Sequence, residues 1–222
     1  RAFYTDTLGP YLETITSLSN FDMALPMNSG AEAVETAIKA ARRWAYLSKK
    51  IESNKAEIIV ADGNFHGRTT TIISFSSDAN SKNDFGPHTP GFVSVEFGSA
   101  KAIEEAINEN TAAVLIEPIQ GEGGIIVPPE NFLPEVREIC TKNNVLMILD
   151  EVQSGLGRTG KMFAFQHSNI QPDGLILGKA LGGGFMPVSC FLASKEVMQW
   201  LTPGSHGSTF GGNPLAAAIG KK

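Results

Sequence analysis

The sequence predicts an α/β fold built on a mostly parallel, doubly wound sheet with helices on both faces. Residues 145–149 and 174–177 are short, unbroken apolar runs, which are typical of strands buried on both faces of a parallel sheet. Between such runs lie longer segments whose apolar residues repeat at helical spacing. This alternation of strand and helix from residue 57 to residue 193 favours the doubly wound architecture.

The size and charge of the chain narrow the classes of function. With 222 residues and a formal net charge of −5, it suits one large domain or one and a half small ones. Its longest basic clusters are the pairs Arg42-Arg43 and Lys49-Lys50, so we expect no nucleic acid partner. No apolar run approaches membrane-spanning length and no signal-peptide pattern is present, so we expect no membrane association.

The cysteines and histidines indicate neither a disulfide framework nor a metal site. Cys140 and Cys190 are expected to be buried free thiols, which favours a reducing compartment. The four histidines show no metal-ligand spacing, so no metal is expected. We therefore expect a cytoplasmic protein, or one of the mitochondrial matrix if the source is eukaryotic.

Both ends of the chain suggest a piece of a longer protein. The sequence opens on Arg1 without an initiator methionine, and it stops inside an expected helix at residues 215–219. We expect further chain at both ends.

The first half of the chain offers an anion site at the start of a helix. A helical segment at 11–18 is followed by an expected break at 26–30. Residues 31–45 then carry an apolar stripe that should pack on the sheet, with Asn28 or Ser29 as the N-cap. Two interpretations remain open: a capped helix alone, or an anion site at which Gly30 would let backbone N–H groups approach a phosphate closely.

The expected strand at 57–61 leads into a turn with three side chains of interest. Phe65 could stack on a planar ring or simply fill the core. Arg68 could clamp a carboxylate with its guanidinium fork. His66, taken alone, reads as a surface or hydrogen-bonded histidine. The polar loop at 76–91 is long enough to line a site or an interface.

Charged residues follow three of the expected strands. Glu117 comes directly after the run at 112–116, Asp150 after 145–149, and Lys179 just after 174–177. Open α/β sheets bind ligands at the carboxyl ends of their strands, so Asp150 and Lys179 are expected to meet at one crevice. A lysine in a glycine-rich turn, with an acid on a neighbouring strand, is a candidate for an amine that bonds a carbonyl group; the alternative is a solvated charge. The intervening helices are expected at 99–108 and 132–143, with a further strand at 93–97.

Two glycine-rich stretches resemble nucleotide-binding motifs or anion sites. Residues 155–160 match G-x-G-x-x-G, and Lys161 almost completes a P-loop. Met162 stands where a P-loop needs Ser or Thr, and the stretch does not open a helix directly after a strand, so both nucleotide readings are rejected. The second stretch, 203–214, is a long turn that could offer the Ser208 and Thr209 hydroxyls to an anion.

Taken together, the motifs resemble the class III aminotransferases, which are fold-type I pyridoxal-phosphate enzymes. The matching stretches follow family order along nearly the whole chain: Asn28-Ser29-Gly30-Ala31-Glu32-Ala33, Phe65-His66-Gly67-Arg68-Thr69, Glu117-Pro118-Ile119-Gln120-Gly121-Glu122-Gly123-Gly124, Asp150-Glu151-Val152-Gln153-Ser154-Gly155, Leu177-Gly178-Lys179-Ala180-Leu181-Gly182-Gly183-Gly184 and His206-Gly207-Ser208-Thr209-Phe210-Gly211-Gly212-Asn213-Pro214. Shorter stretches resemble the members that act on ornithine, among them Arg1-Ala2-Phe3-Tyr4 and Met186-Pro187-Val188-Ser189.

The resemblance implies pyridoxal 5'-phosphate as cofactor. Lys179 would bond the cofactor aldehyde and shuttle the proton, and Asp150 would pair with the pyridine nitrogen. The remaining implied cofactor contacts are Gln153 on the ring oxygen, Phe65 and Val152 on the ring faces, His66 beside the ring, Ser29, Gly30 and Ala31 on the phosphate, and Ser208 and Thr209 reaching it from the partner subunit of a homodimer.

The resemblance also implies the substrates and the extent of the domain. L-ornithine would give its δ-amino group to 2-oxoglutarate, yielding glutamate 5-semialdehyde and glutamate. Arg68 would bind the ornithine carboxylate, and Glu122 would mask an arginine of a small domain. Residues 1–222 would form an incomplete large domain that lacks an N-terminal segment and this C-terminal small domain. Acetylornithine or another ω-amino acid remains an alternative donor, as does a fragment that keeps only cofactor binding or dimerisation.

Overall fold

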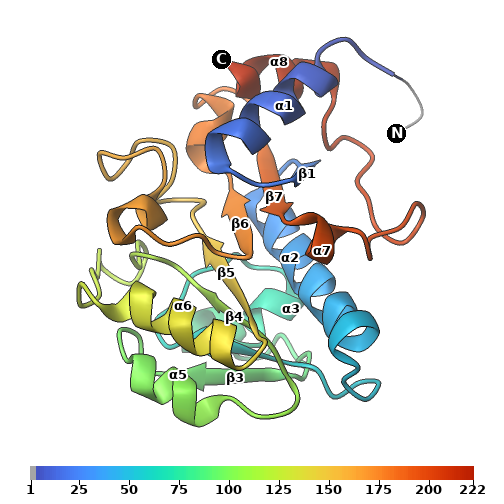
Figure 1. Cartoon of the computed structure of the whole chain (residues 1–222). Coiled ribbons are helices and arrows are strands. Elements are labelled where there is room, and N and C mark those ends of the chain that lie inside the picture. Colours follow the sequence, from blue (N-terminus) through green and yellow to red (C-terminus); the bar gives the residue numbers. More distant parts are fainter. Residues whose placement is uncertain (1–3) are drawn as a thin grey trace.

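A seven-stranded sheet forms the centre of the molecule, in the order β1-β7-β6-β5-β4-β2-β3 (Figure 1). The computed structural model describes residues 4–222, so Arg1 to Phe3 of the stretch quoted above lie outside the described residues. The strands are β1 Met23–Met27, β2 Glu57–Ala61, β3 Phe92–Val95, β4 Thr111–Ile116, β5 Leu146–Asp150, β6 Gly174–Leu177 and β7 Ser189–Ala193. Only β7 among these strands runs against its neighbours, pairing antiparallel with both β1 and β6.

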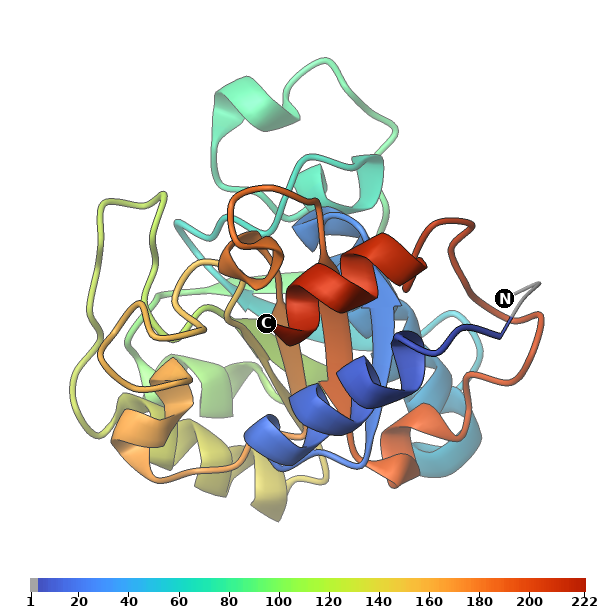
Figure 2. The same cartoon turned by 90° about the horizontal axis from the view of Figure 1, so that it is seen from above.

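Helices cover both faces of this sheet. The helices are α1 Leu8–Ser19, α2 Gly30–Trp44, α3 Thr70–Ile73, α4 Ala79–Lys82, α5 Ala100–Ala106, α6 Phe132–Lys142, α7 Lys195–Met198 and α8 Pro214–Lys221. Three short helices of other types are the π-helix η1 Ala45–Lys49 and the 3-10 helices η2 Ala164–Ser168 and η3 Lys179–Gly182. Helices α1, α5, α6 and α8 share one core, with α1 and α8 side by side (Figures 1 and 2), whereas α2, α3 and α7 pack into the other. The predicted mostly parallel, doubly wound α/β fold is confirmed.

The unbroken apolar runs follow from this arrangement. Along β4, Val114 and Ile116 belong to one core while Ala113 and Leu115 belong to the other. Side chains alternate between the faces of a strand, so a strand covered on both faces must be apolar at every position. These side chains are at most 1% exposed, which is why β4 reads as a continuous hydrophobic run.

The edge of the sheet at β1 differs from the sequence-based expectation. We predicted a break at 26–30, but Pro26 belongs to β1 and pairs with Cys190 of β7. Among residues 4–222, β1 pairs with β7 alone and forms an edge of the sheet. Edge strands tolerate proline, because its missing N–H can face away from the neighbouring strand. The expected strand at 93–97 lies instead at Phe92–Val95, and the expected helix at 99–108 is shorter at both ends, at Ala100–Ala106.

The described part of the chain bears out the prediction for the thiols. Cys140 and Cys190 are both buried and unpaired. Within residues 4–222, no helix is long and apolar enough to span a bilayer.

Candidate functional site

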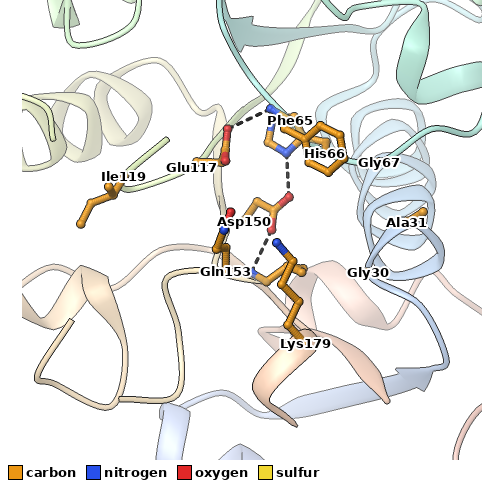
Figure 3. Close-up of a pocket in the computed structure, with 11 residues that line it drawn as sticks. Gly30, Ala31, Phe65, His66, Gly67, Glu117, Ile119, Asp150, Gln153 and Lys179 are labelled. Atoms are coloured by element: carbon orange, nitrogen blue, oxygen red, sulfur yellow. Dashed lines mark hydrogen bonds and ion pairs between the residues drawn. The ribbon is translucent and has the colours of Figure 1, made fainter. Parts of the chain in front are cut away.

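The carboxyl ends of β2, β4, β5 and β6 meet the start of α2 around a cavity of about 180 Å³ (Figure 3). Strand β1 runs parallel to β6, so α2, which follows it, begins at the same edge of the sheet. The cavity is lined by Gly30, Ala31, Phe65, His66, Gly67, Glu117, Ile119, Asp150, Val152, Gln153 and Lys179. The expectation that Asp150 and Lys179 meet at one crevice is therefore met.

Asp150 ends β5 and is buried, with both carboxylate oxygens engaged. One oxygen lies 2.7 Å from His66 Nδ1, and the other accepts the N–H of Val152 at 3.0 Å. His66 is 3% exposed, and its Nε2 has no partner among the described residues. The structure therefore places His66 against Asp150, which fixes the direction of that carboxylate.

Lys179 stands at the first position after β6 and its glycine. Its φ of 41° lies in the left-handed region, which is uncommon for a residue with a side chain. Such backbone strain occurs at functional sites more often than elsewhere. The side chain is 47% exposed and extends toward Asp150 and Gln153 (Figure 3), while its amine lies 3.8 Å from a carboxylate oxygen of Glu122.

The start of α2 leaves backbone donors free at the cavity. Ser29 caps the helix by accepting the N–H of Glu32, and the carboxylate of Glu32 in turn accepts the N–H of Ser29 at 2.7 Å. Within residues 4–222, the N–H groups of Gly30 and Ala31 have no acceptor. Free N–H groups at a helix start favour an anion, because the helix dipole is positive there.

Arg68 and Glu122 do not line this cavity but an adjoining one of about 350 Å³. The two cavities share Phe65, His66 and Gly67. The guanidinium carbon of Arg68 lies 5.5 Å from the centre of the Phe65 ring, on its face. The Phe65 side chain thus contacts Arg68 and lines both cavities, while Glu122 reaches the Lys179 amine at 3.8 Å.

The loop with Ser208 and Thr209 lies against α2 of the same chain. Ser208 Oγ accepts a hydrogen bond from Asn28 Nδ2 at 3.0 Å, directly before the Ser29 cap. His206 holds the loop further along the helix, 2.8 Å from Thr36 Oγ1 and 2.9 Å from Lys39 Nζ. Thr209 is exposed.

Glu117 is a lining residue to which the sequence reading gave no role. Its position after a buried strand was visible in the sequence, but its partners were not. It is 6% exposed and accepts the N–H of Phe65 at 3.0 Å. Burial raises the pKa of its carboxyl above the ordinary value, although nearby His66 opposes this.

Comparison with known proteins agrees with this geometry. Residues 1–222 match the family described as aminotransferase class-III. The chain is 58% identical to the ornithine aminotransferase of Oceanobacillus iheyensis over 219 residues, which is 99% of this chain and 55% of that protein. It thus spans about half the length of the curated relatives it matches.

Solved structures of aminotransferases resemble this chain. This chain superposes on an ornithine aminotransferase from Toxoplasma gondii with a TM-score of 0.98 at 46% identity. The match covers 99% of this chain and 52% of that one, and that structure is described as having partial occupancy of PLP at its active site. An acetylornithine aminotransferase from Elizabethkingia anophelis gives a TM-score of 0.86 at 50% identity, with the same coverage of 99% and 52%. The chain belongs to the class III aminotransferase family.

Proposed function

We propose that this chain is part of the large, cofactor-binding domain of a pyridoxal-phosphate-dependent aminotransferase that acts on ornithine. It would transfer the δ-amino group of L-ornithine to 2-oxoglutarate, giving glutamate 5-semialdehyde and glutamate. The observation that carries the proposal is the meeting of Lys179, Asp150 and the free N–H groups of α2 at one cavity. The ornithine-specific part rests on the names of relatives such as that of Oceanobacillus iheyensis.

The residues around the cavity fit the cofactor group by group. An amine, a carboxylate and a helix start match an aldehyde, a pyridine nitrogen and a phosphate, respectively. Gly30 lets the helix start pack closely on Val152, because a Cβ there would lie 3.0 Å from Val152 Cγ1. When bound, pyridoxal phosphate supplies an aldehyde for an amine and a protonated ring that accepts electrons.

Each residue then has a binding or proton-holding role. Lys179 Nζ would bond the aldehyde carbon and later carry a proton, for which its partly exposed amine is accessible. Asp150 would keep a proton on the ring nitrogen, since a neighbouring carboxylate favours the cation. His66 orients Asp150 through their 2.7 Å contact.

The remaining cofactor contacts surround the ring and the phosphate. Phe65 and Val152 would cover the two ring faces and Gln153 would bond the ring oxygen, all three lining the cavity. Ser29, Gly30 and Ala31 would hold the phosphate, in keeping with the free N–H groups of the last two. Ser208 and Thr209 would assist from the partner subunit of a homodimer.

The adjoining cavity suits the substrate carboxylates. Arg68 offers a planar fork of donors that matches a carboxylate, and its stacking on Phe65 holds it beside the cofactor cavity. Glu122 lies between this cavity and Lys179, so it could pair with a cation from the rest of the protein.

The first test is covalent trapping of the cofactor. The chain is incubated with pyridoxal phosphate, reduced with borohydride, and its intact mass compared with that of Lys179→Ala. Lys161→Ala, whose amine instead bonds the backbone oxygen of Gln166 at 3.0 Å, is the matched control. We expect an adduct in the wild type and the control only. An adduct that persists in Lys179→Ala would assign the chemistry to another lysine.

A second candidate donor is acetylornithine, favoured by the 50% identity to the Elizabethkingia anophelis protein. Single-turnover reactions with ornithine and with acetylornithine separate the two, read as the loss of cofactor that borohydride can trap on the protein. Because the chain spans about half of its relatives, the same assay on a full-length relative shows whether 1–222 turns over or only binds cofactor.

A further inference from the structure

Glu117 is bonded to two loops at the candidate site. It directly follows β4, is 6% exposed and lines the Lys179 cavity. Its Oε2 accepts the N–H of Phe65 at 3.0 Å, and its Oε1 accepts the N–H of Gly121 at 3.4 Å. One carboxylate therefore joins the loop after β2 to the loop after β4. Figure 3 shows Glu117 and Phe65 at the cavity.

Both loops carry groups that face the site. Phe65 lines both cavities, and Gly121 directly precedes Glu122, whose carboxylate lies 3.8 Å from the Lys179 amine. The loops also touch each other above Glu117, because Gln120 Nε2 donates to the backbone oxygen of Asp62 at 2.7 Å. A shift of either loop would therefore move a group at the site.

The chemistry of these bonds requires two acceptors. Both partners of Glu117 are backbone N–H donors, and an ionised carboxylate offers two acceptor oxygens and no donor. A glutamine of the same size offers only one oxygen, and its NH₂ group would face the other donor. An aspartate is shorter by one methylene group.

We propose that Glu117 is a positioning residue that sets the Phe65 ring and, through Gly121, the Glu122 carboxylate. It acts through these two loops rather than by touching the substrate. The inference rests on the proposed function for the identity of the ligand, pyridoxal phosphate.

The test compares Glu117→Gln with Glu117→Asp by amide hydrogen exchange on the chain without cofactor. In Glu117→Gln, the amide oxygen is expected to keep the shorter bond to Phe65, so the Phe65 N–H stays protected while that of Gly121 exchanges faster. In Glu117→Asp, both N–H groups are expected to exchange faster. Unchanged protection of both amides in both variants would overturn the proposal.

The second readout is the dissociation constant for pyridoxal phosphate, measured by quenching of protein fluorescence. In Glu117→Asp the shorter side chain withdraws the acceptor from the Phe65 N–H, and this is expected to weaken binding about tenfold. Glu117→Gln keeps an acceptor for Phe65, so its affinity is expected to fall much less. The control is Glu151→Gln, since Glu151 is also buried and also accepts two N–H groups, from Ala164 and Phe165, but outside the cavity. The control is expected to keep the wild-type affinity.

The outcomes distinguish the proposed function from the inference about Glu117. No binding by the wild type would overturn the proposed function, and the present inference with it. Binding by the wild type and equally tight binding by Glu117→Asp would overturn the inference alone.

Discussion

Gly67 packs closely against the start of α2, and its replacement by alanine should be costly. Its φ is +128°, and an added Cβ would lie 2.9 Å from Ala31 Cβ and 3.3 Å from Ala31 Cα. The backbone conformation alone costs about 1–3 kcal/mol for a residue with a side chain. The overlap with Ala31 adds roughly 1–3 kcal/mol, since backbone cannot move aside easily. We expect Gly67→Ala to lower the free energy of unfolding by about 2–6 kcal/mol.

Gly124→Ala is the matched control for the cost of the backbone conformation. The φ of Gly124 is +117°, and nothing lies within 4 Å of an added Cβ. It should therefore lose only the conformational part, about 1–3 kcal/mol. Urea denaturation of both variants gives the difference between their losses of unfolding free energy. Binding of pyridoxal phosphate should also weaken more in Gly67→Ala than in Gly124→Ala, because Ala31 lines the cavity. Equal losses of stability and equal affinities would refute the argument from close approach.

Two further predictions concern buried titratable groups. Burial raises the pKa of Glu151 from 4.5 to about 7, so the folded state binds the proton more tightly than the unfolded state does. The protonated carboxyl therefore contributes stability that is fully present below pH 4.5 and is lost as the pH rises through about 7. Over this pH range the free energy of unfolding should fall by about 3 kcal/mol in the wild type but not in Glu151→Gln. Urea denaturation at several pH values measures this, and the same pH dependence in both proteins would contradict the prediction. Burial also raises the pKa of Cys140 and of Cys190 to about 12, so neither thiol should react with a disulfide reagent at pH 8 until the chain is denatured. Rapid labelling of the native protein would rule this out.

The sheet could be predicted because its signal is local. A strand such as β4 is apolar throughout, and the positions of Glu117, Asp150 and Lys179 after such strands needed only the rule that parallel strands end at one edge. The edge strand β1 was missed because Pro26 is a breaker in most contexts. Only its place at the edge of the sheet makes this proline acceptable, and that place depends on strand order.

The partners within the site could not be predicted from the sequence, because they join distant segments. His66 and Asp150 are 84 positions apart, and Phe65 and Glu117 are 52 apart. The sequence shows that each side chain stands at a strand end, but not which donor meets which acceptor. Taken alone, His66 therefore read as a surface or hydrogen-bonded histidine, and the resemblance implied a cofactor contact; neither predicted its contact with the Asp150 carboxylate.

Val152 shows how one side chain can account for two glycines that the sequence explains separately. Read locally, Gly30 belongs to a helix start and Gly178 to a turn after a strand. In the structure both face Val152, since a Cβ at Gly30 would lie 3.0 Å from Val152 Cγ1 and one at Gly178 would lie 3.2 Å from the same atom. The valine thus fills the space between the helix start and the turn with Lys179, at the floor of the cavity. The two glycines let α2 and β6 approach each other, so the free N–H groups of α2 and the Lys179 amine come to serve one site.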